Sequence, residues 1–302
     1  MMVNPSSTGN YDGKWRFILN QRDQWRAVAI PYKTLAASCD TRFILSDKSN
    51  LGLGLQINTD KSGDAAMSTN VATLHSAIHQ QFAGNRLQVS AGASIGFGII
   101  DLDYNKLNFD SQFNGDYFDP DLSHGVFLMH ETPTYIDISG GASVRYSFNP
   151  DFDMNIGGAL YHINQPERSF FSSTNVFLNR KMVVYVMNTV RLTQNVTLLP
   201  QCLLMQQESY RQINFGSQVQ FATNQKNLSA LFAGVYYRWR DAVVARVGFQ
   251  YAGLRLGLSY DINASDLVKA SYGRGGLEIS LIYITLPAKQ IITPKNICPV
   301  FM

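Results

Sequence analysis

Few residues of this 302-residue chain have the spacing that metal binding or catalysis requires. The clearest candidate is "DLDYN", which places Asp101, Asp103 and Asn105 at alternate positions, as in the first half of a calcium-binding loop. The glycine and the later glutamate of such a loop are missing. A solvated acidic loop is therefore the favoured interpretation, and we expect no metal site.

Histidine and cysteine offer little more. His75 and His79 would share one face of a helix, but along a strand they are separated, and no third ligand accompanies them. We interpret them as structural or interior histidines. Cys39 and Cys202 fit as small apolar strand residues, whereas the role of Cys298 stays open. No nucleophile elbow, phosphate loop or Cys–His pair is visible, so we expect neither enzyme activity nor a cofactor.

The elements that would position any site are strands. In "NRLQVSAGASIGFG", residues 85–98, apolar and small polar residues alternate almost without error. This period of two is typical of a strand with one apolar face, yet the segment exceeds the roughly 5–6 residues of an ordinary strand. The same pattern predicts fourteen strands, at residues 15–24, 34–46, 51–58, 67–82, 85–98, 135–148, 153–164, 180–192, 196–207, 212–222, 228–237, 242–251, 254–261 and 276–286.

The connections between these strands alternate in length. Every second one is a short turn such as "AGN", "NPD" or "YAG", and the others include the long segments 101–133 and 165–179. Short turns on one rim and long loops on the other are typical of an outer-membrane barrel, whose closure leaves no unpaired sheet edge in the lipid. We therefore predict an all-β, closed antiparallel barrel of about fourteen strands. Its single domain would comprise a periplasmic segment 1–13, a barrel 14–287 and a periplasmic tail 288–302.

Charge placement agrees with this prediction. Only 16% of residues are charged, and the net charge of +3 is too scattered for a nucleic-acid-binding surface. An arginine facing the bilayer midplane would cost roughly 2–4 kcal/mol, so strand charges should face the lumen. We expect ion pairs that fill the barrel rather than ligand contacts. The predicted lumenal network is Asp40, Arg42, Arg86, Asp137, Arg145, Arg246, Arg255, Asp261 and Glu278.

Several passages resemble the PorP/SprF family. They are the opening "NPSSTG" with "LNQRDQW", the central "GGALYHINQPERSF", and "GRGGLEISLIY" with the closing "CP". Ser6 and Ser7 depart from the usual alanine and large residue, which is a minor difference. The resemblance implies an outer-membrane protein of the Bacteroidota type IX secretion system, with a signal peptide and a short mature segment lost before Met1.

The family resemblance leaves two roles open. SprF-like members help to secrete or anchor a large surface protein such as a gliding adhesin, and PorP-like members associate with periplasmic parts of the secretion machine. Partners would thus be lipid, a secreted client and secretion components. The alternative is a channel for small or hydrophobic molecules resembling the fourteen-stranded fatty-acid transporters. A hydrolase is a more distant alternative.

The long-loop rim is the expected site for a client, because aromatic side chains with a few charges are common in interface cores. The predicted partner-binding residues are Tyr104, Phe109, Phe113, Tyr117, Phe118, Phe170 and Phe171. Machine components would instead contact the tail 288–302, which carries Lys289, Ile291, Ile292, Lys295 and Phe301.

Overall fold

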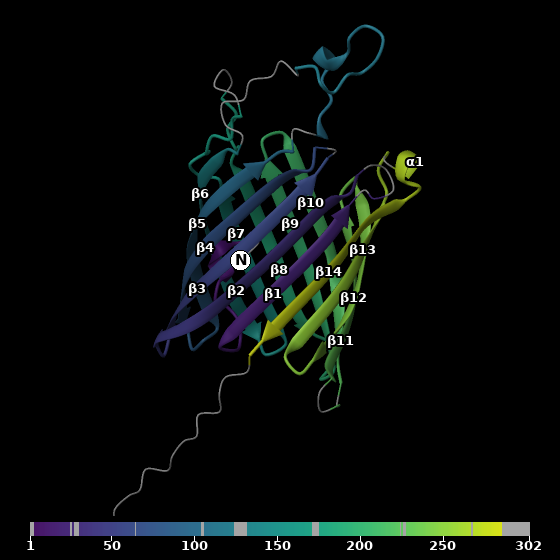
Figure 1. Cartoon of the computed structure of the whole chain (residues 1–302). Coiled ribbons are helices and arrows are strands. Elements are labelled where there is room, and N and C mark those ends of the chain that lie inside the picture. Colours follow the sequence, from purple (N-terminus) through teal and green to yellow (C-terminus); the bar gives the residue numbers. More distant parts are fainter. Residues whose placement is uncertain are drawn as a thin grey trace, which may run out of the picture.

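Fourteen antiparallel strands form one closed sheet, in which every strand pairs with its neighbours in sequence and β1 pairs with β14 (Figure 1). This computed structural model describes residues 3–285 except 25, 27–29, 64, 104–105, 124–131, 171–174, 224, 226–227 and 267. The predicted barrel and its fourteen strands are confirmed. No helix in these described ranges is long and apolar enough to cross a membrane.

The strands are β1 Trp15–Gln24, β2 Tyr32–Ser46, β3 Ser49–Ser62, β4 Met67–Phe82, β5 Leu87–Asp101, β6 Thr134–Asn149, β7 Phe152–Tyr161, β8 Lys181–Arg191, β9 Val196–Gln207, β10 Tyr210–Ala222, β11 Leu228–Arg238, β12 Ala242–Tyr251, β13 Leu254–Asn263 and β14 Arg274–Ile284. Strands β2 to β6 have 14 to 16 residues, whereas the others have 10 to 13. One wall of the barrel is therefore longer than the roughly 9–11 residues that cross a bilayer.

The alternation in sequence becomes an inside-out distribution of side chains. In β3, Leu53, Leu55 and Ile57 are exposed on the outer surface, whereas Gln56 between them is buried on the lumenal side. In β5, Ile95 is exposed and its neighbour Ser94 is buried. Lipid is the solvent for the outer face, so exposed aliphatic side chains there need no partner, while the polar side chains face the lumen.

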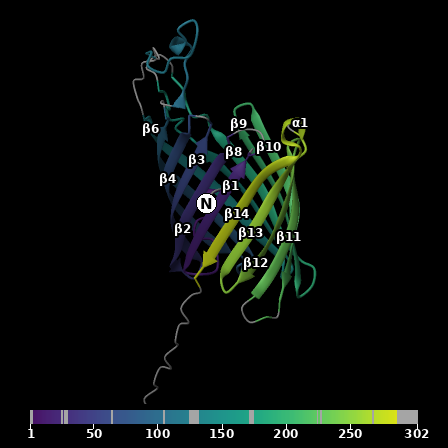
Figure 2. The ribbon, with the colours of Figure 1, turned by 45° about the vertical axis from the view of Figure 1, so that its right-hand side comes forward.

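The two rims differ as predicted (Figure 2). We call the end with the connections 47–48, 83–86, 150–151, 192–195, 223–227 and 252–253 the short-turn rim. The opposite end, the long-loop rim, carries residues 102–133 and 162–180, and the connection 264–273 with the short helix α1 Val268–Ser271. Strand β14 ends at the short-turn rim. The tail 288–302 lies outside the described residues.

Candidate functional site

The first residues of the described chain lie inside the barrel. Strand β1 begins at the short-turn rim. Residues 3–14, which precede it, lie along the lumenal wall of β2 to β7 (Figure 1). We call them the lumenal segment. It contains one turn of 3-10 helix, η1 Pro5–Ser7, whose Asn4 side chain accepts a hydrogen bond from the Ser6 amide. Asn4, Ser6 and Thr8 are completely buried.

Polar side chains of the wall bind this segment at fixed points. The Asn4 amide donates to the carbonyls of Ala142 and Gly158, both at 3.0 Å. The Ser6 hydroxyl lies 3.0 Å from that of Ser143 in β6. His79 Nε2 lies 2.7 Å from the Thr8 carbonyl and its Nδ1 2.8 Å from the Ser90 hydroxyl. Buried polar groups need such partners, so these hydrogen bonds fix the position of the segment.

Glycines of the wall make room for it. An added Cβ at Gly92 would lie 2.6 Å from both the Pro5 carbonyl carbon and the Ser6 nitrogen. A Cβ at Gly52 would overlap the Thr8 carbonyl, and one at Gly141 would overlap the Asn4 side chain. Backbone therefore packs directly on backbone in this groove, which only glycine permits.

Asp40 anchors the end of the segment nearest β1. Its carboxylate accepts hydrogen bonds from the Gly9 amide at 2.7 Å and from the Arg16 guanidinium at 2.8 and 2.9 Å. Arg16 also donates to the Ser7 carbonyl. The Tyr11 hydroxyl donates to the Asp40 carbonyl at 2.7 Å. Burial, and then the negative charge of Asp40, raise the pKa of Tyr11 to about 12, which keeps this hydroxyl protonated.

The prediction of a periplasmic segment at residues 1–13 is therefore wrong for its described part. The physical reason lies in the lumenal wall, whose glycines leave a groove and whose carbonyl and serine hydroxyl groups line it. The polar "NPSSTG" supplies matching donors, acceptors and small side chains. Residues 1 and 2 lie outside the described residues.

A second cluster of charges joins strands β1, β11, β13 and β14 near the long-loop rim. Asp261 Oδ2 lies 2.6 Å from Arg22 Nη2 and 3.0 Å from Arg238 Nη1. Arg22 also contacts Glu278, and Arg238 contacts Asp241. The prediction included Asp261 and Glu278 but missed both arginines. Both arginines alternate with the apolar residues of their strands, and this alternation could have placed them on the lumenal face.

The other predicted network residues are dispersed along the wall. Asp137 accepts from His162 Nδ1 at 2.9 Å, and Arg145 contacts Asp153 at 3.1 Å in a half-exposed pair. Arg42 follows Asp40 on the lumenal face of β2. Arg86 lies exposed in the turn 83–86, so its predicted place within a lumenal strand is wrong. The structure begins β5 at Leu87, two residues after the predicted start, which leaves Arg86 outside the strand.

Arg246 and Arg255 are lumenal, as predicted, but lack the expected ion pairs. No carboxylate lies within 4.0 Å of either guanidinium in the described part of the chain. Instead both lie near the ring of Phe232, with Cζ 5.8 and 4.4 Å from its centroid.

Five of the seven predicted partner-binding residues lie in the part of the chain that the structure describes. Residues 106–123 contain the 3-10 turn η3 Asp110–Gln112 and an antiparallel bridge between Phe113 and Phe118. We call this segment the aromatic hairpin; it stands clear of the barrel rim (Figure 1). Phe113, Tyr117 and Phe118 are exposed, Phe109 is half-buried at the N-cap of η3, and Phe170 is half-buried in the connection 162–180. Tyr104 and Phe171 lie outside the described residues.

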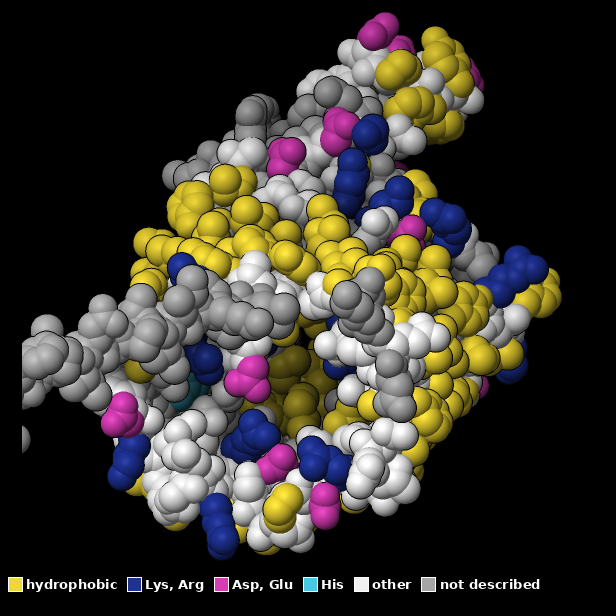
Figure 3. All heavy atoms as spheres, turned by 90° about the horizontal axis from the view of Figure 1, so that it is seen from below, with side chains coloured by type: hydrophobic (Ala, Val, Ile, Leu, Met, Phe, Trp, Pro, Cys, Tyr) yellow, Lys and Arg dark blue, Asp and Glu magenta, His cyan; other side chains and the backbone are white. Residues whose placement is uncertain are grey.

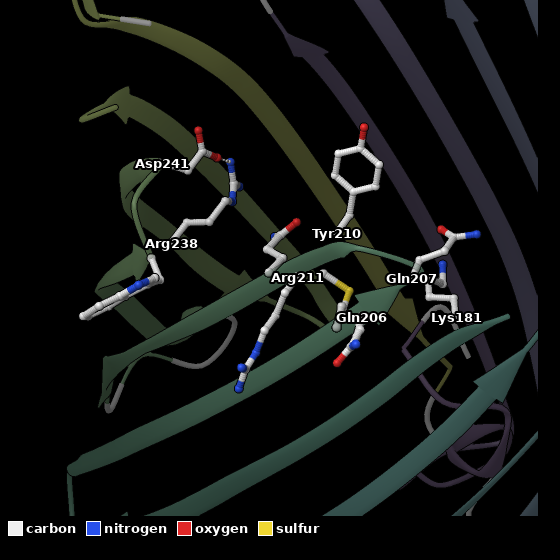
Figure 4. A pocket seen from close by; sticks show the side chains of 10 residues that line it. Lys181, Gln206, Gln207, Tyr210, Arg211, Arg238 and Asp241 are labelled. Carbon is white, nitrogen blue, oxygen red and sulfur yellow. Dashed lines mark hydrogen bonds and ion pairs between the residues drawn. The ribbon is translucent and has the colours of Figure 1, made fainter. Parts of the chain in front are cut away.

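A cavity of about 460 Å³ opens at the long-loop rim between β8 and β12 (Figure 4). Three cations, Lys181, Arg211 and Arg238, line it with one carboxylate, that of Asp241. Lys181 Nζ lies 4.8 Å from the Tyr161 ring centroid. The remaining lining is Met205, Gln206, Gln207, Tyr210, Gln212 and Trp239. The cavity therefore carries an excess of positive charge.

The histidine and cysteine interpretations agree with the structure. His75 and His79 are buried on the lumenal face of β4, and Cys39 and Cys202 are free thiols within strands. In the described part of the chain no group of three or more metal-ligating side chains gathers. Asn105 and Cys298 lie outside it.

Comparisons with known proteins give one family and one fold. Residues 1–283 match the family model described as "Type IX secretion system membrane protein PorP/SprF". No curated protein sequence matches the chain. The Ralstonia pickettii toluene transporter TbuX has a similar structure, with a TM-score of 0.56 and 11% identity over 93% of this chain and 92% of that one. The Pseudomonas putida toluene transporter TodX has a TM-score of 0.55 and 10% identity over 93% of this chain and 91% of that one. The CymD monoaromatic hydrocarbon channel has a TM-score of 0.53 and 12% identity over 95% of this chain and 92% of that one. At these identities the likeness is one of fold.

Proposed function

Because the chain belongs to the PorP/SprF family of type IX secretion system membrane proteins and folds as an outer-membrane barrel, we propose that it holds a secreted client protein at the cell surface, or helps to export it, from the long-loop rim. The role is non-enzymatic, since it requires binding alone. The observation that supports it best is the aromatic hairpin, which projects from that rim with Phe113, Tyr117 and Phe118 exposed. Exposed aromatic residues are frequent anchors of protein interfaces.

The electrostatics of the same rim support a peptide partner. The aromatic hairpin carries Asp110, Asp116, Asp119 and Asp121 against Lys106, and the cavity between β8 and β12 carries the opposite excess. A client with charges of both signs would find complementary surfaces on the two sides of the barrel mouth. Among the described residues the short-turn rim carries short connections, so a periplasmic secretion component would have less described surface to contact.

The test is to replace residues 110–121 by a flexible glycine–serine linker of equal length in the producing bacterium. Surface and culture-medium proteins are then compared by quantitative mass spectrometry. We expect at least one surface protein to be lost from the cells, either released into the medium or retained behind the outer membrane. Heat-modifiable migration checks that the barrel has assembled. An unchanged surface proteome with an assembled barrel would contradict the proposal.

A channel is the second candidate function. Viewed from the short-turn side, the barrel is hollowed, with hydrophobic side chains deep inside and charged ones around the opening (Figure 3). The transporters TbuX and TodX share this fold. Conductance in planar bilayers separates the two functions. A large conductance that responds to a substrate would favour the channel, and a closed barrel would favour client binding.

A further inference from the structure

A compact polar site lies on the lumenal wall of β11 to β14, away from the lumenal segment. Phe232, Gly248, Gly257 and Ser280 are successive partners across these four strands, so they form one row on the lumenal face. The two glycines leave a depression in the middle of the row. The Phe232 ring covers Gly248, where an added Cβ would overlap it.

Arg246 fills the other half of the depression. An added Cβ at Gly257 would lie 3.2 Å from Arg246 Nη2 and 3.4 Å from its Nε, so the guanidinium lies against that glycine. Nη2 also donates to the Ser280 hydroxyl at 3.2 Å. Arg255 projects from the next strand and places its Cζ 4.4 Å from the centroid of Phe232. One aromatic ring thus supports two guanidinium groups through cation–π contacts.

This pair differs from most of the lumenal arginines. Arg16, Arg22 and Arg238 each contact a carboxylate. Among the described residues, none lies within 4.0 Å of Arg246 or Arg255. Two neighbouring like charges in a barrel wall are unfavourable unless an opposite charge accompanies them.

We propose that Arg246 and Arg255, supported by Phe232, form a lumenal binding site for a small oxyanion, namely the carboxylate or phosphate group of a solute. The planar guanidinium fork matches the geometry of either group, and hydrogen bonds between ions are about twice as strong as neutral ones. The Tyr236 side chain interacts electrostatically with both arginines and adds a hydroxyl group to the proposed site. Both guanidinium groups are half-buried on the lumenal side, and the barrel is hollowed when it is viewed from the short-turn side (Figure 3).

The test is isothermal titration of the purified full chain in zwitterionic detergent at low ionic strength. The probes are sodium benzoate, inorganic phosphate and uncharged benzamide. We expect benzoate or phosphate to bind, benzamide to bind at least about tenfold more weakly than the better anion, and added salt to reduce anion affinity. Benzoate alone would indicate a carboxylate site and phosphate alone a phosphate site. Failure of both anions to bind the wild-type chain overturns the proposal.

Variants locate the binding. The double substitution Arg246→Gln and Arg255→Gln should reduce anion affinity by about tenfold or more. Arg145→Gln is the matched control, because that lumenal arginine already contacts Asp153, and its affinity should match the wild type. If the double variant does not assemble, Arg255→Lys keeps the charge but loses the fork, and it should still bind benzoate more weakly. Wild-type affinity in an assembled double variant, or in Arg255→Lys where the double variant does not assemble, would also overturn the site.

Discussion

The two carboxylate oxygens of Asp40 each accept a hydrogen bond from Arg16, Oδ1 from Nε at 2.9 Å and Oδ2 from Nη2 at 2.8 Å. This side-on, bidentate geometry is the strongest form of ion pair between these groups. Asp40 is only 1% exposed, and its Oδ2 also receives the Gly9 amide. The pair therefore connects the first strand, the second strand and the lumenal segment at one point.

Replacing Asp40 by Asn should destabilise the barrel strongly. The substitution leaves the Arg16 guanidinium without its buried counter-charge, which typically costs about 3–5 kcal/mol. The measurement is the free energy of unfolding by urea in lipid vesicles. Asp153→Asn is the control, because its pair with Arg145 is half-exposed and should contribute about 1 kcal/mol or less. Equal effects of the two substitutions would contradict the role assigned to Asp40.

The carboxylate of Asp261 should be similarly sensitive. It is buried and faces two arginines, so Asp261→Asn leaves both Arg22 and Arg238 short of negative charge, at a cost of about 3–5 kcal/mol. Asp241→Asn removes a far more exposed carboxylate from the same cluster and should have a small effect. Urea unfolding of the two variants gives the comparison. A larger loss for Asp241→Asn would show that the cluster is wrongly described.

Gly92→Val should displace the lumenal segment. Its first added carbon would already lie 2.6 Å from the backbone of Pro5 and Ser6, and neither backbone can move aside while Asn4 remains bound. We expect an increase in ion conductance through the barrel in planar bilayers. Gly140→Ala is the control, because its added Cβ would have no neighbour closer than 3.7 Å. Identical conductance in both variants and the wild type would mean that the segment does not restrict the lumen.

Arginine scanning along β5 tests the membrane position. Ile95 lies near the middle of the strand with its side chain outward, and Leu87 begins the strand at the short-turn rim. Ile95→Arg should cost about 2–4 kcal/mol and Leu87→Arg about 0–1 kcal/mol, because the penalty depends on depth in the bilayer. Unfolding in vesicles measures both. A reversed order would place the bilayer elsewhere on the barrel.

The strands were predictable because lipid contacts one face of the sheet and the polar lumen the other, so apolar and polar residues alternate along each strand. Leu53 and Gln56 need opposite environments, and only a strand with a lipid face and a lumenal face provides both within four residues. Short and long connections alternate along the chain, and this alternation assigns each connection to a rim without any knowledge of contacts. Arg86 shows the limit of this reasoning, because a turn can absorb one more residue than the alternation suggests.

The lumenal sites were less predictable because they depend on registers between strands. Gly52, Gly92 and Gly141 are far apart in sequence, and they form one groove only after β3, β5 and β6 are aligned. In the same way, Phe232 meets Arg255 only through the alignment of β11, β12 and β13. Alternation within a strand states which face a residue occupies but carries no information on its neighbours across the sheet.

The position of the lumenal segment bears on the order of barrel biogenesis. The described contacts of this segment beyond residue 14 include the first seven strands, from Asp40 in β2 to Gly158 in β7. A nascent sheet of these strands could thus bind the lumenal segment before β8 to β14 are added. Closure between β1 and β14 would then enclose a half of the barrel that the lumenal segment already lines.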